Sequence, residues 1–219
     1  ASAYRNGFND MNANKEWLLA SPQSEDQSAY YWTAPFAFID HTTTSYYATF
    51  VNADFVSKFS NTDVRNIFVA SSTISNPADF RRYTTRKFKF NFGSDVPLIR
   101  TAEMILIDAE ALARTPGKEA EAHDLLYALQ KNRDANAVKS TNTGAALIDE
   151  ILLERRKELY AENGVEWFDA KRLRKGITRT GNHRIFKNLS ADDKRFFLKV
   201  PQSEIDANES IDDTVNKDR

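Results

Sequence analysis

One segment, residues 151–172 (ILLERRKELYAENGVEWFDAKR), limits the possible folds of this chain more than any other. Apolar residues in and just before it recur at helical spacing, which predicts one amphipathic helix that runs into a tight aromatic turn. These apolar residues are Leu147, Ile148, Ile151, Leu152 and Leu159. Arg155 and Glu162 fall on or beside the same face. Because an unpaired buried charge costs roughly several kcal/mol, the segment predicts a semi-buried network of Arg and Glu side chains.

The acids of this segment have two interpretations. Glu154, Glu158 and Glu162 are spaced four residues apart, so neighbouring carboxylates could share a helix face and split their pKa values, as acid–base catalysis requires. However, Lys157 follows Glu154 by three residues, and Arg155 precedes Glu158 by three. Because such pairing neutralises the acids, we favour a structural role over a catalytic one.

Composition narrows the classes of protein. The 219 residues, 41% of them hydrophobic, can form one large globular domain or two small ones. With 30 basic and 31 acidic residues there is no overall field that would attract nucleic acid. We interpret a local basic run, residues 81–87, as a solvated strand or loop. There is no cysteine, and no apolar run approaches the ~20 residues of a membrane span.

The chain changes character at Pro97. Of the 26 aromatic residues, 19 lie before this proline, in a part that is also rich in polar residues. We therefore predict a loop-rich, aromatic ligand-binding region over residues 1–96 and a helical region over residues 97–219, together forming one compact domain. Within the first region, Phe55 and Phe59 indicate a short helix, and the alternation of Phe88, Phe90 and Phe92 indicates a strand.

Three helices are expected after Pro97. The first extends from Leu98 to Leu112 and stops at the turn of residues 115–117. The second starts near Lys118, and its apolar face is expected to contain Ala122, Leu125, Leu126 and Leu129. Together they have the length of one tetratricopeptide-type helical hairpin. Asn142 or Thr143 caps the third helix, which leads into the segment of residues 151–172. The predicted fold class is mainly α, a tetratricopeptide-like scaffold with long aromatic-rich loops and a little β structure.

Residue patterns of catalytic and cofactor sites are missing from the sequence. His41, His123 and His183 lie far apart without zinc-binding spacing, and the seven glycines form no phosphate- or dinucleotide-binding loop. There is also no nucleophile elbow. The sequence thus predicts no metal and no cofactor, and it favours binding over catalysis.

An aromatic cluster is the best candidate for a binding site. Flat rings with polar neighbours suit carbohydrate, because a ring stacks on the C–H face of a sugar while carboxylates and amides bond its hydroxyls. The alternative is that these rings only anchor loops onto the helices. The candidate ligand-binding residues are Trp17, Asp26, Tyr30, Tyr31, Trp32, Tyr46 and Tyr47.

Four motifs resemble the SusD/RagB family of outer-membrane glycan-binding lipoproteins. Residues 95–111 (DVPLIRTAEMILIDAEA) are similar to the family's P-x-x-R-x-AE-x-x-L-x-x-AEA helix, and residues 150–159 (EILLERRKEL) to its I-x-x-ER-x-x-EL helix. Residues 167–172 (WFDAKR) resemble its WFD-x-KR motif, and residues 200–208 (VPQSEIDAN) its closing P-x-x-E-I-x-x-N. One departure is residues 162–166 (ENGVE), which are one residue longer than the family's EG-x-R pattern.

The resemblance implies a non-enzymatic role. Such proteins capture oligosaccharide or polysaccharide at the cell surface and deliver it to a SusC-like TonB-dependent transporter in the outer membrane. Members are about twice as long as this chain, which therefore looks like a C-terminal portion without the N-terminal lipid anchor. In this picture the motif residues form a structural ion-pair network. Its members are Arg100, Glu103, Glu110, Glu154, Arg155, Glu158, Glu162, Asp169 and Arg172.

Two other functions are weighed against this one. A helical-repeat module for protein interaction would have no sugar site, and its Tyr30, Tyr31 and Trp32 would be buried rather than gathered at a cleft. A glycoside hydrolase would need two carboxylates about 5–10 Å apart. Only the loop acids could supply these, which makes this the least favoured function. The loop acids are Asp10, Glu25, Asp26 and Asp40.

Overall fold

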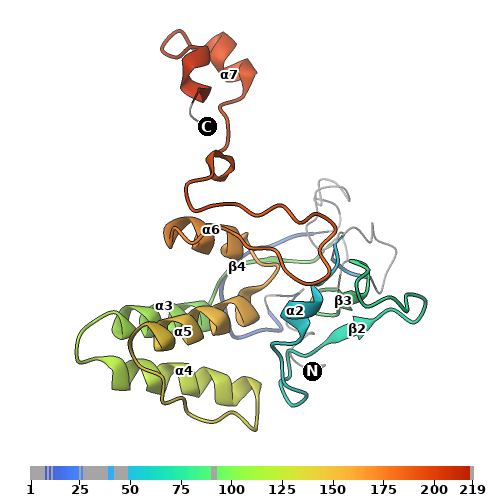
Figure 1. The fold of residues 1–219 in the computed structure, drawn as a ribbon, viewed down its shortest axis with the longest axis vertical. Coiled ribbons are helices and arrows are strands. Elements are labelled where there is room, and N and C mark those ends of the chain that lie inside the picture. Colours follow the sequence, from blue (N-terminus) through green and yellow to red (C-terminus); the bar gives the residue numbers. More distant parts are fainter. Residues whose placement is uncertain are drawn as a thin grey trace. The chain divides into compact units, whose positions relative to one another are not determined.

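The protein is mainly helical with a little β structure, as the sequence predicts (Figure 1). The computed structural model describes residues 8, 10, 12–24, 26, 39–41, 49–89 and 93–217. Its strands are β1 (Trp17–Ser21), β2 (Phe68–Ala70), β3 (Tyr83–Thr85) and β4 (Val96–Arg100). Its α-helices are α2 (Ala53–Val56), α3 (Thr101–Ala113), α4 (Glu119–Arg133), α5 (Gly144–Leu159), α6 (Val165–Arg172) and α7 (Gln202–Ala207). Two 3₁₀ turns are η3 (Lys194–Phe196) and η4 (Asp213–Asn216).

The chain forms two compact units. The first contains Ala1–Asn163 and Gly181–Arg184, and the second contains Gly164–Thr180 and Ile185–Arg219. The change in composition at Pro97 therefore falls inside the first unit. The physical reason is that β1, before this proline, pairs with β4, which contains it.

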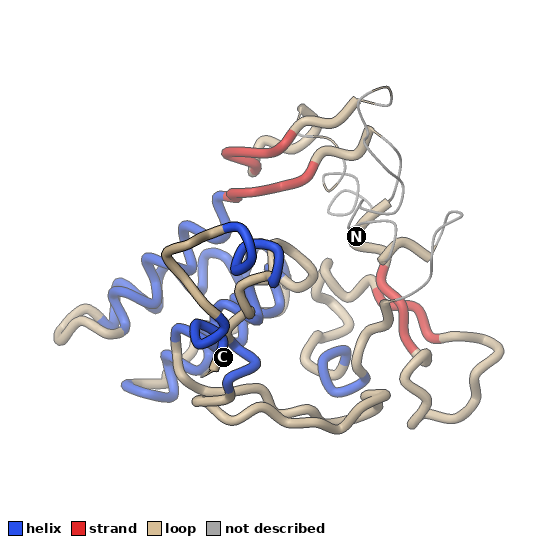
Figure 2. Tube along the Cα trace, turned by 90° about the horizontal axis from the view of Figure 1, so that it is seen from above, coloured by secondary structure: helices blue, strands red, loops and turns tan. Residues whose placement is uncertain are grey.

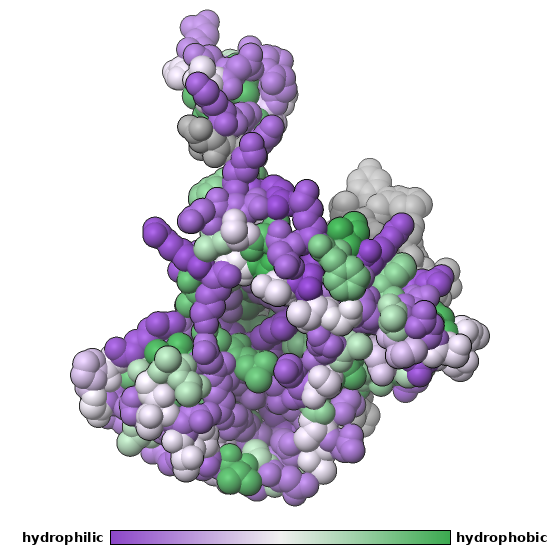
Figure 3. Space-filling view, viewed as in Figure 1, coloured by the Kyte–Doolittle hydropathy of each residue, from purple (hydrophilic) through white to green (hydrophobic). Residues whose placement is uncertain are grey.

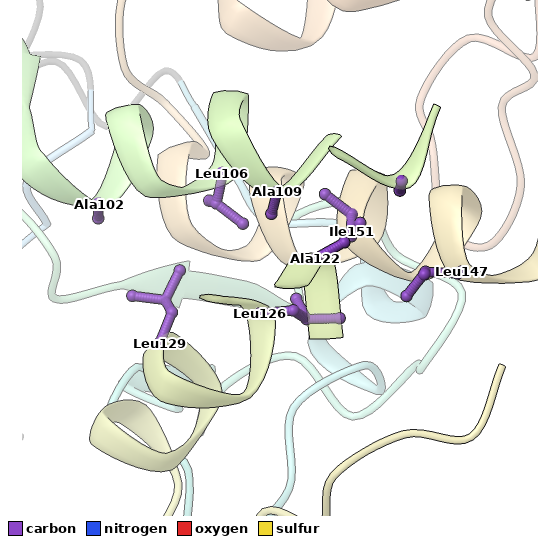
Figure 4. Close-up of a cluster of buried hydrophobic side chains, with 9 residues drawn as sticks. Ala102, Leu106, Ala109, Ala122, Leu126, Leu129, Leu147 and Ile151 are labelled. Atoms are coloured by element: carbon purple, nitrogen blue, oxygen red, sulfur yellow. The ribbon is translucent and has the colours of Figure 1, made fainter. Parts of the chain in front are cut away.

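Helices α3, α4 and α5 share one apolar core in the first unit. Figure 4 shows their side chains turned toward one another, with Leu106 of α3, Leu126 of α4 and Ile151 of α5 among them. On α4, the predicted face is confirmed, since Ala122, Leu126 and Leu129 are all buried. In the described part of the chain, no helix is both long and apolar enough to cross a membrane.

Helix α3 begins later than predicted. The helix expected from Leu98 starts at Thr101, because residues 96–100 form β4 and pair with β1 in antiparallel register. Pro97 lies opposite Ala20, and Arg100 lies opposite Trp17. The apolar spacing that suggested helix at Leu98 thus belongs to a strand whose partner lies about eighty residues away in the sequence.

The segment of residues 151–172 forms two helices instead of one helix and a turn. Helix α5 starts after Thr143, one of the two predicted caps, and ends at Leu159. The chain then passes through left-handed backbone at Ala161, Asn163 and Gly164, with φ of 60°, 46° and 68°. Left-handed residues stop a helix, so α6 starts anew at Val165. The expected aromatic turn at Trp167 is therefore part of a helix.

The strands form two separate two-stranded sheets, drawn in red in Figure 2. One joins β1 to β4, and the other joins β2 to β3. The strand predicted from Phe88 to Phe92 is wrong at Phe88 and Lys89, which belong to no strand. Burial does not alternate there, since both Lys87 and Phe88 are fully buried. Phe90 and Phe92 lie outside the described residues.

The short helix predicted around Phe55 and Phe59 is confirmed. Asn52 caps α2, its side chain accepting a hydrogen bond from the Asp54 amide. The rings of Phe55 and Phe59 meet edge to face with centroids 5.1 Å apart, and both pack against Tyr160 just after α5. This aromatic cluster attaches the loops of the first unit to the C-terminal end of α5.

The second unit has a small core of its own. The rings of Trp167 in α6 and Phe196 in η3 lie 4.8 Å apart. Ile177 and Leu189 exchange two backbone hydrogen bonds of 2.9 Å. Gly176 has a φ of 69°, and a Cβ there would lie 2.3 Å from the Leu189 carbonyl oxygen, so only glycine fits.

Truncating Leu126 should open a cavity in the helical core. We expect Leu126→Ala to lower the free energy of unfolding by about 2–5 kcal/mol, because the side chain is almost completely buried. Val138→Ala is the matched control, since Val138 is 83% exposed. Chemical denaturation followed by circular dichroism measures both. Equal effects of the two substitutions would contradict the assignment of the core.

Candidate functional site

Charged side chains from six parts of the first unit meet at the C-terminal end of α5. We call this set the central charge network. It is joined by ion pairs with N–O distances of up to 3.7 Å. Its members are the acids Glu16, Asp63, Glu154, Glu158 and Glu162 and the bases Arg65, Lys87, Arg100, Arg133 and Lys157.

Glu158 lies at the centre of the network and is fully buried. Its Oε1 accepts from Arg100 Nη1 at 3.1 Å and from Arg133 Nη2 at 3.0 Å, and its Oε2 accepts from Arg65 Nη1 at 2.9 Å. Burial by itself would raise the pKa of Glu158. The positive charges of Arg100 and Arg133 outweigh burial and hold this pKa well below its ordinary value. Glu158 is therefore ionised in the folded protein.

Arg65 connects the loop before β2 to α5. It binds Asp63 through two hydrogen bonds, Nε to Oδ1 at 2.9 Å and Nη2 to Oδ2 at 2.8 Å. Its Nη1 also lies 2.7 Å from Glu154 Oε1. This second contact is an ion pair without hydrogen-bond alignment, because no N–H points at that oxygen. Lys157 Nζ completes the group at 3.1 Å from Asp63.

Lys87 and Arg100 cap the end of α5. The Lys87 ammonium donates to the carbonyl oxygens of Glu158 and Tyr160, at 3.0 and 2.9 Å, and also pairs with the Glu162 carboxylate. Arg100 Nη2 donates to the Glu158 carbonyl at 3.1 Å. These cations satisfy carbonyls that have no partner within the helix and face the negative end of its dipole. Burial lowers the pKa of Lys87 to about 8, although Glu162 opposes that shift.

Aromatic rings cover the cations. Phe8 lies over both Lys87 Nζ and the Arg100 guanidinium, each 5.0 Å from its centroid. The Tyr160 ring lies 4.3 Å from Lys87 Nζ, and its hydroxyl is 2.8 Å from Thr85 Oγ1. Such cation–π contacts stabilise charges that are shielded from water. The rings therefore pack beside the network and shield its cations from water.

This arrangement suits a structural role. Its five carboxylates face five cations, so the charge balances, and Glu158 is held ionised by three arginines. A general acid needs a raised pKa, which is the opposite of what these arginines impose on Glu158. The geometry agrees with the structural interpretation of the acids on α5, although the partner of Arg155 is Glu103 rather than Glu158.

The other five predicted ion-pair residues lie in three further pairs, one of which is completed by Arg114. Arg155 Nη2 contacts Glu103 Oε1 at 2.8 Å, joining α5 to α3. Glu110 pairs with Arg114 one helical turn later, also at 2.8 Å. In the second unit, Asp169 accepts from Arg172 at 2.7 Å. Only Arg100, Glu154, Glu158 and Glu162 of the predicted set belong to the central charge network.

Sequence reasoning missed half of the network. Asp63 and Arg65 lie two residues apart, but Glu158, which binds Arg65, is 93 residues further along the chain, and Glu16 and Arg133 are 117 residues apart, so these four residues carry no local signal for the network. The interpretation of residues 81–87 as a solvated run is wrong for Lys87, because its side chain is fully buried. The reason is that Glu162 and two helix-end carbonyls supply the partners that a buried ammonium needs.

The predicted ligand-binding residues lie mostly outside the described part of the chain. This holds for Tyr30, Tyr31, Trp32, Tyr46 and Tyr47. Asp26 is exposed. Trp17 is only 5% exposed and packs on Phe8 with ring centroids 6.1 Å apart. A tryptophan buried in this way has little free face for a sugar, so its position is that of a core residue.

The loop acids considered for a hydrolase do not form a described pair. Asp40 is completely buried and forms a backbone bridge with Thr85. Asp10 is exposed, and Glu25 lies outside the described residues. Among the described residues, no group of three or more His, Cys, Asp or Glu side chains could hold a metal ion.

The four sequence motifs and the helical scaffold are explained by one family. Residues 86–216, more than half of the chain, match the SusD family. The chain belongs to the SusD family. The match covers α3, α5, α6 and α7, the helices on which the four motifs lie. It also covers Lys87, Arg100, Glu158 and Glu162 of the central charge network.

Solved SusD-like structures share this fold. A SusD-like carbohydrate binding protein from Bacteroides vulgatus matches 99% of the chain with a TM-score of 0.79 and 25% identity. A SusD superfamily protein from Bacteroides thetaiotaomicron matches 94% with a TM-score of 0.79 and 26% identity. A third, from Bacteroides fragilis, shares the fold at 21% identity with a TM-score of 0.74, covering 96% of this chain and 48% of its own. The chain spans 50% of each of the first two. No curated protein matches it.

Removing the charge of Glu158 should destabilise the protein strongly. We expect Glu158→Gln to cost about 3–5 kcal/mol, because it leaves Arg65, Arg100 and Arg133 crowded around a neutral side chain. Asp124→Asn is the control, since the exposed Lys139–Asp124 pair should contribute little. Urea unfolding of both variants measures the difference. A loss no larger than that of the control would refute the role given to Glu158.

Stability should fall in acid. The pKa of Glu158 is lowered in the folded state and returns to about 4.5 on unfolding, so the unfolded chain binds the additional proton. The stabilisation is fully present above this value and is lost as pH falls below it. We expect the thermal midpoint to drop between pH 5 and pH 3, roughly, and to drop less steeply in Glu158→Gln. Scanning calorimetry across this range measures how steeply the thermal midpoint falls with pH in each protein. Equal steepness in the two proteins would contradict the role assigned to Glu158.

Proposed function

We propose that this chain is part of a non-catalytic glycan-binding protein of the cell surface. In this proposal it captures oligosaccharide or polysaccharide and passes it to a SusC-like TonB-dependent transporter in the outer membrane. The protein to which it belongs is held at that membrane by an N-terminal lipid anchor. The observation that carries the proposal is the SusD family match over residues 86–216.

The structural comparison supports sugar as the ligand class. One of the similar structures is that of a SusD-like carbohydrate binding protein, and its fold covers 99% of this chain. The described acids agree with binding rather than hydrolysis. Glu154 and Glu158 on α5 and Glu162 after it are occupied by ion pairs, and Asp40 is buried. A hydrolase would need a free pair of carboxylates across a cleft.

We assign sugar contact to the aromatic residues before the helices. Tyr30, Tyr31, Trp32, Tyr46 and Tyr47 are the proposed contacts, with Asp26 as a hydrogen-bond acceptor for hydroxyls. Trp17 is left out because it is buried against Phe8. The central charge network then has the separate role of holding the loops of the first unit on the helical scaffold.

Removing one proposed sugar-stacking ring should weaken glycan binding. We expect Trp32→Ala to lower affinity for the bound glycan by about tenfold or more, taking as the scale the ~1–3 kcal/mol that stacking on an aromatic ring contributes for a nucleic-acid base. Isothermal titration calorimetry against a panel of neutral polysaccharides measures this on the 219-residue chain.

The control is an exposed ring away from the proposed contacts. Phe186→Ala removes a side chain that is 67% exposed in the second unit, and it should leave affinity for neutral glycans unchanged. Failure of the unmodified chain to bind any glycan in the panel would favour the helical-repeat interaction module. Equal losses in Trp32→Ala and Phe186→Ala would show that the contacts are assigned wrongly.

A further inference from the structure

Charge is strongly segregated within the second unit. Residues 171–180 and 185–199 together contain nine Lys and Arg residues and only two acids, Asp192 and Asp193. The whole chain, in contrast, has a net charge of −1. From residue 202 onward the sequence is mainly acidic. The positive charge is thus concentrated in one part of a nearly neutral protein.

The fold brings the two basic stretches together. Ile177 and Leu189 are joined by two backbone hydrogen bonds, and the Arg179 amide donates to Asn188 Oδ1 at 2.8 Å. The Arg179 guanidinium also donates to the Lys187 carbonyl. Figure 3 shows hydrophilic side chains gathered over α6 and the segment that follows it. The two stretches are therefore joined at these residues, and the ring contact between Trp167 and Phe196 also joins α6 to η3, which contains Lys194.

Much of this positive charge is not neutralised. Arg172 pairs with Asp169, and Arg195 pairs with Asp193. Four further exposed cations make no ion pair with any residue that the structure describes, and of these Lys187 lies near enough to Asp193 for its charge to act on that carboxylate. They are Arg174, Lys187, Lys194 and Lys199. Like charges within one small unit repel one another, and a polyanion would relieve that repulsion.

An exposed aromatic ring, that of Phe197, lies beside Lys171. Phe197 is 52% exposed, and the Lys171 ammonium lies 4.7 Å from the centroid of its ring. A ring beside ammonium groups offers both contacts that a charged sugar needs, stacking for its C–H face and ion pairing for its acidic group. Carboxylate is an acceptor that this surface already binds, in the pairs Arg172–Asp169 and Arg195–Asp193.

We propose that this surface binds acidic polysaccharide through the carboxylates of uronic acid units. The contacts are Lys171, Arg174, Lys187, Lys194, Lys199 and the ring of Phe197. The inference rests on the proposed glycan-binding function and adds to it a ligand class and a second contact surface. Neutral sugars would use only the aromatic residues before the helices, whereas acidic chains would also use the basic surface.

The test compares one polysaccharide backbone with and without its charge. Isothermal titration calorimetry of the 219-residue chain at low ionic strength uses polygalacturonate and its fully methyl-esterified form. We expect the acid form to bind more tightly, and added salt to remove the difference. In Lys187→Gln/Lys194→Gln/Lys199→Gln, affinity for polygalacturonate should fall about tenfold, the sum of three modest ion pairs.

A matched variant controls for overall charge. Lys58→Gln/Lys131→Gln/Lys139→Gln removes three exposed cations of the first unit and should retain the affinity of the unmodified chain. Equal losses in the two triple variants would overturn the proposal, because attraction would then depend only on net charge. Equal binding of the acid and ester forms would also overturn it, and so would binding of phosphatidylglycerol vesicles without binding of polygalacturonate.

The two functional proposals can fail separately. If the chain binds neutral glycans in a Trp32-dependent manner but does not distinguish the acid from the ester, the basic surface has no role and the proposed function stands. If no glycan of either kind is bound, the proposed function fails first. Circular dichroism of each triple variant checks that the chain remains folded.

Discussion

The structure of the first unit depends on how the C-terminal end of α5 is neutralised. This end presents unpaired carbonyl groups and the negative pole of a helix dipole, and the acids Glu158 and Glu162 add full negative charges beside them. Arg65, Lys87, Arg100 and Arg133 arrive from four other segments to pair with these groups. Because a buried charge without its partner is costly, the loop before β2, the segment after β3, the end of β4 and the end of α4 must all reach the same place.

A network of this kind contributes specificity more than net stability. Desolvation of ten charged groups offsets much of the attraction among them, so an apolar core of similar volume could stabilise the unit as well. An apolar core tolerates small shifts, however, whereas Arg65 bonds Asp63 through two N–H groups and contacts Glu158 and Glu154 through a third nitrogen. We infer that the network fixes the position of the loops of the first unit on the scaffold. The helical core of α3, α4 and α5 supplies the apolar burial.

The motifs that identify the family and the residues proposed to contact ligand lie in different parts of the chain. The motifs that establish membership of the SusD family lie on the helices, where their charged residues pair with one another or with the loops. The proposed sugar contacts lie before these helices, and the proposed contacts with acidic glycans lie on the second unit. The charges inside the scaffold therefore serve its structure, and the proposed ligand contacts are other residues, namely the rings before the helices and the cations of the second unit.

The sequence by itself determined the helical class, the apolar face of α4, the short helix at Phe55 and the burial of charge on α5. These features follow from local spacing, since residues three or four positions apart share a helix face. Only the tertiary structure decided which charges meet. Lys87 looks like a solvated residue in the sequence and is buried because Glu162 lies 75 residues away in the chain and beside it in space. Leu98 looks helical and lies in a strand because β1 pairs with that segment. Pairing between distant segments leaves no periodic trace in either one, which is why the partners of Glu158 became visible only in three dimensions.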